Sequence, residues 1–201
     1  MSDAWANTTH DWQASVDRDH LLLIAGQPSA FAPGGARHLL HEALAYVADE
    51  VEAADDSSAR CDVDILADGS VTVRDYGRGT DTRRDSKGGI VRKPVMATMD
   101  LRFFDEPATP ILPDGHARRG MSVVCALSEW VLHENHRLDG AWAQRYERGV
   151  PIGDLTELAA DGVTGTLVHF MPRRDLTQLV ERDLGAVTAD WPRLHFPPDS
   201  R

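Results

Sequence analysis

The sequence predicts an α+β fold, a two-layer α/β sandwich in which helices cover one face of a mixed, mostly antiparallel sheet. Three observations carry this prediction: a long amphipathic helix near the N-terminus, paired segments with strand-like alternation, and a short apolar helix that follows a glycine-bearing loop and precedes more strands. The chain has 201 residues, 42% of them hydrophobic, which is enough to bury a core.

We divide the chain into three parts. Residues 1–35 are predicted to form an N-terminal arm and a connecting loop, because the first twenty residues show no sustained period and residues 27–35 are rich in Pro, Gly and Ala. Residues 36–172 are predicted to form the main domain. Residues 173–201 are predicted to form a C-terminal helix and tail, since charges alternate with leucine and valine between Asp175 and Val187.

The main domain is expected to begin with a helix from Ala36 to Ala54, where apolar residues recur at helical spacing. A hairpin follows, because segments 61–66 and 70–75 alternate around an Asp-Gly turn. Loops are expected at 76–89 and 107–120, with a short helix at 94–99 between them. A helix at 121–127 and strands at 130–134, 141–146 and 166–170 complete the domain.

Charge and cysteine content exclude several classes of protein. The chain carries 21 Lys and Arg against 32 Asp and Glu, a net charge of −11, and this works against direct binding of duplex DNA. Cys61 and Cys125 form no Cys-x-x-Cys motif and are expected to be buried, reduced thiols. The apolar stretch from Leu21 to Ala25 is too short to span a membrane. We therefore expect a cytoplasmic protein with no membrane partner.

Four segments, in this order, resemble one family, the GHKL (Bergerat) ATP-binding domain of bacterial gyrase B and topoisomerase IV B. They are residues 41–50 (HEALAYVADE), 73–79 (VRDYGRG), 120–128 (GMSVVCALS) and 164–172 (TGTLVHFMP). The resemblance covers most of the 36–172 domain. It implies the fold stated above and a pocket for ATP or ADP.

The resemblance also implies roles for individual residues. Glu42 corresponds to the general base that activates the attacking water. Asp75 corresponds to the carboxylate that accepts the adenine amino hydrogen, with Thr166 anchoring a water beside it. Glu50 and Arg78 correspond to an ion pair beside the base, and Arg137 to an arginine at the pocket mouth. The remaining residues that would line the ligand are Tyr46, Asp49, Val73, Gly79, Gly120, Met121 and Val168.

The chain departs from the family at the triphosphate end. Tyr46 stands where the family has a magnesium-binding asparagine, and a phenol is a poor ligand for Mg²⁺, so no metal ligand is assigned. In the segment that corresponds to the phosphate-binding loop, 114–120, Arg118 replaces the middle glycine. Phe103 and Phe104 replace a glycine pair before the lid, and the Arg-Pro-Gly-Met-Tyr motif of the arm is missing. Without the transducer and DNA-cleaving parts, the chain is not expected to be a topoisomerase by itself.

Other catalytic motifs are weaker. His38, His41 and Glu42 do not have the His-Glu-x-x-His spacing of a zinc site, and neither do His133 and His136; all four histidines are expected to lie at the surface. The sequence contains no Gly-x-Ser-x-Gly elbow.

Four hypotheses remain open at this stage. The first is a stand-alone, degenerate gyrase B-like domain that binds an adenine nucleotide or an adenine mimic, with ATP hydrolysis weak or lost. The second is a protein that sequesters an aminocoumarin-type inhibitor in a producing or resistant bacterium. The third is a homodimer or a regulatory partner of an intact gyrase, with Trp5 and Trp12 of the arm as anchors. The fourth is a pocket re-used for other catalysis, with Glu42 as the base.

Overall fold

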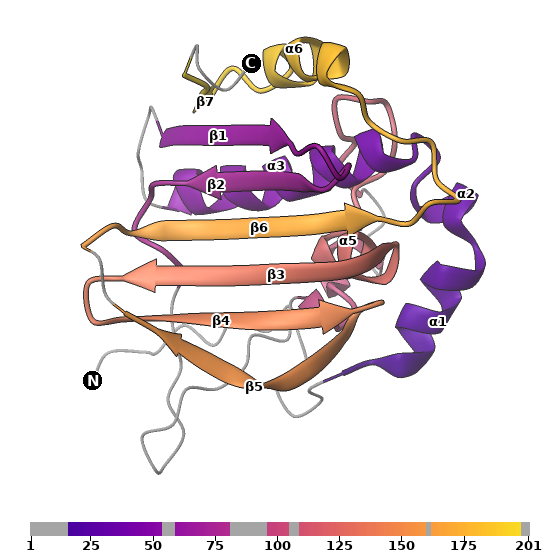
Figure 1. The fold of residues 1–201 in the computed structure, drawn as a ribbon. Coiled ribbons are helices and arrows are strands. Elements are labelled where there is room, and N and C mark those ends of the chain that lie inside the picture. Colours follow the sequence, from indigo (N-terminus) through magenta and orange to yellow (C-terminus); the bar gives the residue numbers. More distant parts are fainter. Residues whose placement is uncertain (1–15, 54–58, 81–95, 105–108, 160–161, 198–201) are drawn as a thin grey trace, which may run out of the picture.

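The structure, a computed structural model, describes residues 16–53, 59–80, 96–104, 109–159 and 162–197. Its centre is a seven-stranded sheet with the order β5-β4-β3-β6-β2-β1-β7 (Figure 1). The strands are β1 (Ala59–Ile65), β2 (Val71–Asp75), β3 (Ser128–Arg137), β4 (Gly140–Glu147), β5 (Val150–Leu158), β6 (Gly165–Pro172) and β7 (Leu194–His195). Every pair is antiparallel except β1 with β7. The predicted fold class, a two-layer sandwich with a mixed, mostly antiparallel sheet, is confirmed.

Helices cover one face of the sheet (Figure 1). The long helix is α3 (Ala36–Ala53), within one residue of its predicted end, and the short apolar helix α5 (Met121–Ala126) packs beside it. The core lies between these helices and the sheet. Its fully buried apolar side chains include Leu39, Leu40, Leu44, Val63, Val73, Val123, Val131, Val168 and Phe170.

Part of the predicted arm is helical instead. Helices α1 (Arg18–Gly26) and α2 (Pro28–Phe31) fall within residues 1–35, and Asp17 caps α1 by accepting a hydrogen bond from the His20 N–H at 3.0 Å. Leu21 and Ile24 of α1 belong to the main core, and α1 packs against α5. The segment that carries Trp5 and Trp12 lies outside the described residues.

The C-terminal part joins the same fold. Helix α6 (Glu181–Ala189) begins later than the sequence predicts, and Leu184 and Val187 on its inner face are buried. Beyond it, β7 pairs with β1 and extends the sheet by one short strand. The tail thus covers the β1 edge.

Two further elements differ from the prediction. The predicted helix at 94–99 begins outside the described residues; Met96 has 3₁₀ conformation, residues 97–98 form a turn and a bend, and helix α4 (Leu101–Phe104) follows where the sequence predicts no helix. Strand β5 was not predicted; it is an edge strand with a mostly exposed surface. Cys61 and Cys125 are free, buried thiols, as predicted, and burial raises the pKa of both.

Candidate functional site

Asp75 ends strand β2 and is buried, with 2% of its surface exposed. Its Oδ1 accepts a hydrogen bond from the Gly77 N–H at 2.9 Å. Its Oδ2 accepts one from the backbone N–H of Thr166 at 3.0 Å and another from the Thr166 hydroxyl. The structure therefore brings two predicted site residues, 91 positions apart in the sequence, into direct contact.

This contact depends on how β2 and β6 pair. The strands are antiparallel with Val73 opposite Val168, so the end of β2 lies beside the beginning of β6. Gly165 has a φ of +123°, and a Cβ there would come within 2.1 Å of the Asp75 carbonyl oxygen. Only glycine allows the two backbones to approach so closely at this corner.

The next turn is tied to strand β3. Thr80 donates to Asn135 Oδ1 from its backbone N–H at 2.8 Å and from its hydroxyl at 3.1 Å, and Asn135 Nδ2 donates back to the Thr80 carbonyl at 3.1 Å. Gly79 has a φ of +73° and lies against the His136 carbonyl, where no side chain would fit. Arg137 Nη1 donates to the Gly79 carbonyl at 3.3 Å, which places this arginine at the rim of the same corner.

Tyr46 points from α3 toward the sheet. Its side chain is buried, and its hydroxyl lies 3.5 Å from His133 Nε2 on β3. Burial is the main reason why the pKa of this phenol is raised well above its ordinary value of 10.0; the charges of Glu50 and Asp75 add to the effect, and a hydrogen bond with Thr80 opposes it. The charge of Asp75 therefore affects the pKa of this phenol.

Glu42, one helical turn before Tyr46, is fully buried, although the helical pattern predicts that it lies at the polar edge of the helix. Its carboxylate accepts hydrogen bonds from the backbone N–H groups of Arg119, at 2.5 Å, and Gly120, at 2.8 Å. Gly120 is the N-cap of α5. The carboxylate thus binds the end of segment 114–120, which corresponds to the phosphate-binding loop of the resembled family.

His38 links Glu42 to the same loop. Its Nδ1 lies 2.7 Å from Asp114 Oδ2, and its Nε2 lies 3.5 Å from Glu42 Oε1. Burial lowers the pKa of His38, but the hydrogen bonds and charges of Glu42 and Asp114 outweigh burial and raise that pKa above 6.5. For Asp114, burial raises the pKa, while the contacts with His38 and the His116 N–H bring it below 3.8.

Arg118, the residue in place of a loop glycine, turns toward α3. Its guanidinium donates to Asp49 through Nη1 at 2.9 Å and Nη2 at 2.8 Å, a bidentate pair. It also lies 4.4 Å above the ring of buried Phe103, so this phenylalanine supports the loop. Arg102 approaches the same Asp49 carboxylate at 3.6 Å.

The other predicted residues fall into two groups. Val73 and Val168 are paired in β2 and β6, Gly79 follows β2, and Met121 begins α5; all four are buried. Arg78 is exposed, and its predicted ion pair with Glu50 stays a prediction.

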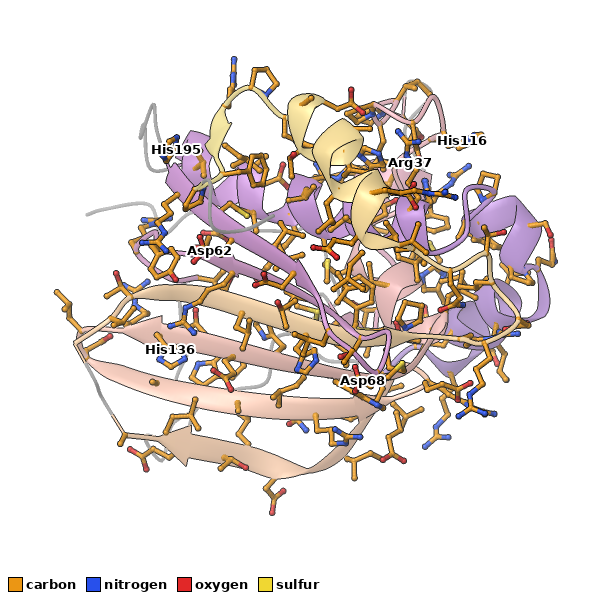
Figure 2. All side chains as sticks on the ribbon, turned by 45° about the horizontal axis from the view of Figure 1, so that its top comes forward. Arg37, Asp62, Asp68, His116, His136 and His195 are labelled. Carbon is orange, nitrogen blue, oxygen red and sulfur yellow. The ribbon has the colours of Figure 1, made fainter. Side chains whose placement is uncertain are left out.

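The expected surface position of the histidines is wrong. His38, His41 and His133 are fully buried, and His136 is 7% exposed. Figure 2 shows His136 on β3, at the end of the sheet away from the β1–β2 turn that carries Asp68. Within the described ranges no group of three or more His, Cys, Asp or Glu side chains is arranged to hold a metal ion. No helix of the described residues is long and apolar enough to cross a membrane.

Four contributors to the site were not predicted from the sequence: His38, Thr80, Asp114 and Asn135. Of these four, His38 is the one whose role the sequence could have indicated, because residues at i and i+4 of a helix, here His38 and Glu42, face each other. Asp114, Thr80 and Asn135 act across long separations that no local pattern reveals.

Comparisons with known proteins agree with this fold. No protein-family model matches the chain. DNA gyrase B of Synechocystis is 37% identical over 142 residues, which are 70% of this chain and 13% of that protein. DNA gyrase B of Mycolicibacterium smegmatis is 35% identical over 162 residues, 81% of this chain and 24% of that protein. The chain thus spans less than a quarter of the length of these relatives.

Two solved structures are similar. The ATPase domain of Thermus thermophilus gyrase B, in complex with an aminocoumarin, has a TM-score of 0.63 and 26% identity, covering 83% of this chain and 43% of that one. The topoisomerase IV ATP-binding domain of Francisella tularensis, with a small-molecule inhibitor, has a TM-score of 0.64 and 22% identity over 84% of this chain and 45% of that one, and so supports the fold alone. The chain belongs to the GHKL superfamily, as a gyrase B-like ATP-binding domain.

Proposed function

We propose that this domain binds an adenine nucleotide or an adenine-mimicking small molecule at Asp75, and that ATP hydrolysis is weak or lost. The observation that carries the proposal is the buried Asp75 carboxylate, oriented by Thr166 and Gly77. An ionised carboxylate has room for about four hydrogen bonds, and the described contacts supply three donors. The remaining acceptor position suits an exocyclic amino group on a flat ring.

The rim of the site supports a flat ligand. Gly79 brings the backbone beside this corner close against β3, and the apolar pair of Val73 and Val168 lies in the adjoining strands. The buried Tyr46 ring, whose pKa is affected by the charge of Asp75, is the aromatic group that we expect a ligand at Asp75 to contact.

The triphosphate end argues against efficient hydrolysis. A general base must be free to accept a proton from water, but Glu42 is fully buried and already binds two backbone N–H groups. Magnesium requires oxygen ligands in near-octahedral geometry, and Tyr46 directs its hydroxyl to β3 instead. The residues present fit the base of a nucleotide and do not fit its metal.

Calorimetric titration with adenosine, ADP and ATP, each with and without Mg²⁺, tests the proposal. We expect the wild-type protein to bind, and we expect Asp75→Asn to abolish this binding. Asp64→Asn, which changes an exposed carboxylate on the neighbouring strand β1, should leave the binding unchanged. Equal binding by the Asp75→Asn variant, once its fold is verified by circular dichroism, would contradict the proposed site. If the wild-type protein releases phosphate from ATP and Glu42→Ala abolishes this release, the domain is a working ATPase.

A second candidate function is binding of an aminocoumarin. The structure of Thermus thermophilus gyrase B to which this chain is similar contains such a compound. This chain keeps Asp75 and Thr166 in contact, with Arg137 at the rim. At about 100 times Kd, a bound aminocoumarin should add about 2.7 kcal/mol to the free energy of unfolding, and an unchanged melting temperature would exclude this function.

A further inference from the structure

We infer that the site selects ligands without phosphate groups, because the chain's own side chains already satisfy the positions where phosphates would bind. This inference rests on the proposed function and names its ligand class: an uncharged, flat heterocycle with an amino donor, such as adenine or adenosine. Two separate contacts carry it, the carboxylate of Glu42 on the loop N–H groups and the ion pair of Arg118 with Asp49.

Glu42 acts as an internal anion. Each of its oxygens accepts one N–H of the loop, from Arg119 and Gly120, and none of its surface is exposed. His38 lies on its other side at 3.5 Å. A phosphate oxygen would need the same two N–H groups, so it could bind only if the carboxylate moved away.

Displacing Glu42 would be costly. The carboxylate would lose two charge-assisted hydrogen bonds and would remain in a buried region, next to an incoming anion of the same sign. Like charges placed in a site of low polarity repel strongly, because little water screens them. The loop therefore discriminates against a phosphate and has no such effect on a neutral ligand at Asp75.

The guanidinium groups in and near the loop offer little compensation. Arg118 has its charge paired by Asp49 in a bidentate contact, and its side chain is 11% exposed. Arg102 is shared between Asp100 at 2.7 Å and Asp49 at 3.6 Å. These arginines would have to break existing ion pairs before they could hold a phosphate.

Arg119 is the remaining cation of the loop. It donates from Nη1 to the Phe103 carbonyl at 2.8 Å and lies 5.2 Å above the ring of Phe104. Its guanidinium is thus directed at α4. Among the described groups named here, four carboxylates (Glu42, Asp49, Asp100 and Asp114) stand against three arginines and the His38 imidazole, so this set carries no surplus positive charge for a triphosphate.

Titration of the wild-type protein with adenosine, AMP and ATP under one buffer condition tests the inference. We expect adenosine to bind at least about tenfold more tightly than ATP, with AMP between them. We expect Glu42→Ala, which frees the two N–H groups, to raise the affinity for ATP by about tenfold while adenosine affinity stays within about twofold. Glu129→Ala is the matched control, because it removes one carboxylate from β3 that pairs with Arg148.

The outcomes separate the two proposals. If ATP binds the wild-type protein as tightly as adenosine, the inference is wrong while the proposed function stands. If neither binds, both fail. If Glu42→Ala does not fold, Glu42→Gln replaces it, since glutamine keeps the shape and removes the charge. An equal gain in ATP affinity with Glu129→Ala would point to overall charge and would overturn the role assigned to Glu42.

Discussion

Trp191 Nε1 donates a hydrogen bond of 3.1 Å to Nδ1 of His41, which is fully buried in α3. The two residues are 150 positions apart, and their rings lie 6.1 Å from each other. The segment after α6 is therefore attached to the helix that carries the candidate site. The bond also sets the tautomer of His41, because Nδ1 must be the acceptor.

Removing this hydrogen bond should weaken the fold. In Trp191→Phe the buried Nδ1 of His41 loses its donor, which should lower the free energy of unfolding by about 1–3 kcal/mol. Trp130→Phe is the control, since Trp130 lies on β3 against His169 and Arg145, and we expect a smaller loss there. Urea unfolding followed by fluorescence and circular dichroism measures both. Equal losses would mean that ring volume alone, and not the hydrogen bond, stabilises the contact.

The corner at Gly165 should tolerate no side chain. A Cβ at this position meets the Asp75 carbonyl oxygen at 2.1 Å, at a φ of +123°. Gly165→Ala should therefore cost more than about 3 kcal/mol, because both backbone strain and a backbone clash are introduced. Gly153→Ala, where φ is +68° and the space is open, should cost about 1 kcal/mol. Thermal unfolding of both variants measures these two losses of stability. A Gly165→Ala variant as stable as the wild type would disprove the close approach of the two backbones.

The Asp114 and His38 pair should make stability depend on pH. The raised pKa of His38 means that its contribution is complete below 6.5 and is lost as the pH rises through the folded pKa. The lowered pKa of Asp114 means that its contribution is present above 3.8 and is lost as the pH falls through the folded pKa. The pair therefore stabilises most between these two values.

Asp114→Asn tests this window. We expect it to lower the free energy of unfolding by about 1.5–3 kcal/mol near pH 5.5 and by progressively less as the pH rises through the raised pKa of His38, because the charge on His38 is then lost. The difference between wild type and variant is the quantity to follow, since burial lowers the pKa of His20, His41 and His169 and gives them the opposite dependence. A difference that does not shrink as the pH rises from 5.5 would rule out the charged pair.

Tyr46 should destabilise the fold at alkaline pH. Its pKa in the folded chain is well above 10.0, so only the unfolded state loses the proton near pH 10. Stability should then fall by up to about 1.4 kcal/mol per pH unit from this one group. Tyr46→Phe should remove that part of the slope. Parallel curves for wild type and variant between pH 9.5 and pH 11 would show that the phenol is not buried in solution.

Local periodicity predicted the elements that bury an apolar face. Helix α3 and the β1–β2 hairpin repeat apolar residues at helical and strand spacing, so the predicted bounds of both lie close to the observed ones. Strand β5 was not predicted, because Pro151 and Gly153 interrupt a mostly exposed stretch. This stretch is extended through its pairing with β4. Helix α1 is nine residues long, too short for a sustained period, and its Asp17 cap is a weak signal alone.

The site was only partly predictable, for a physical reason. The resemblance placed Asp75 and Thr166 together, since both follow from how strands pair. The burial of Glu42 was not visible, because a polar residue on a helix is covered here by a loop 77 residues away. Arg118 was recognised as a departure, but its partner Asp49 became apparent only from the three-dimensional arrangement.

The position of β6 has a consequence for how the chain is made. Strands β1 and β2 form one local hairpin, and β3, β4 and β5 form a local meander, but β6 comes after all of them and lies between β2 and β3 (Figure 1). During synthesis the ribosome therefore releases two half-sheets with open edges before the strand that joins them exists. The Asp75–Thr166 contact, built from the end of β2 and the start of β6, is assembled only when this last central strand inserts.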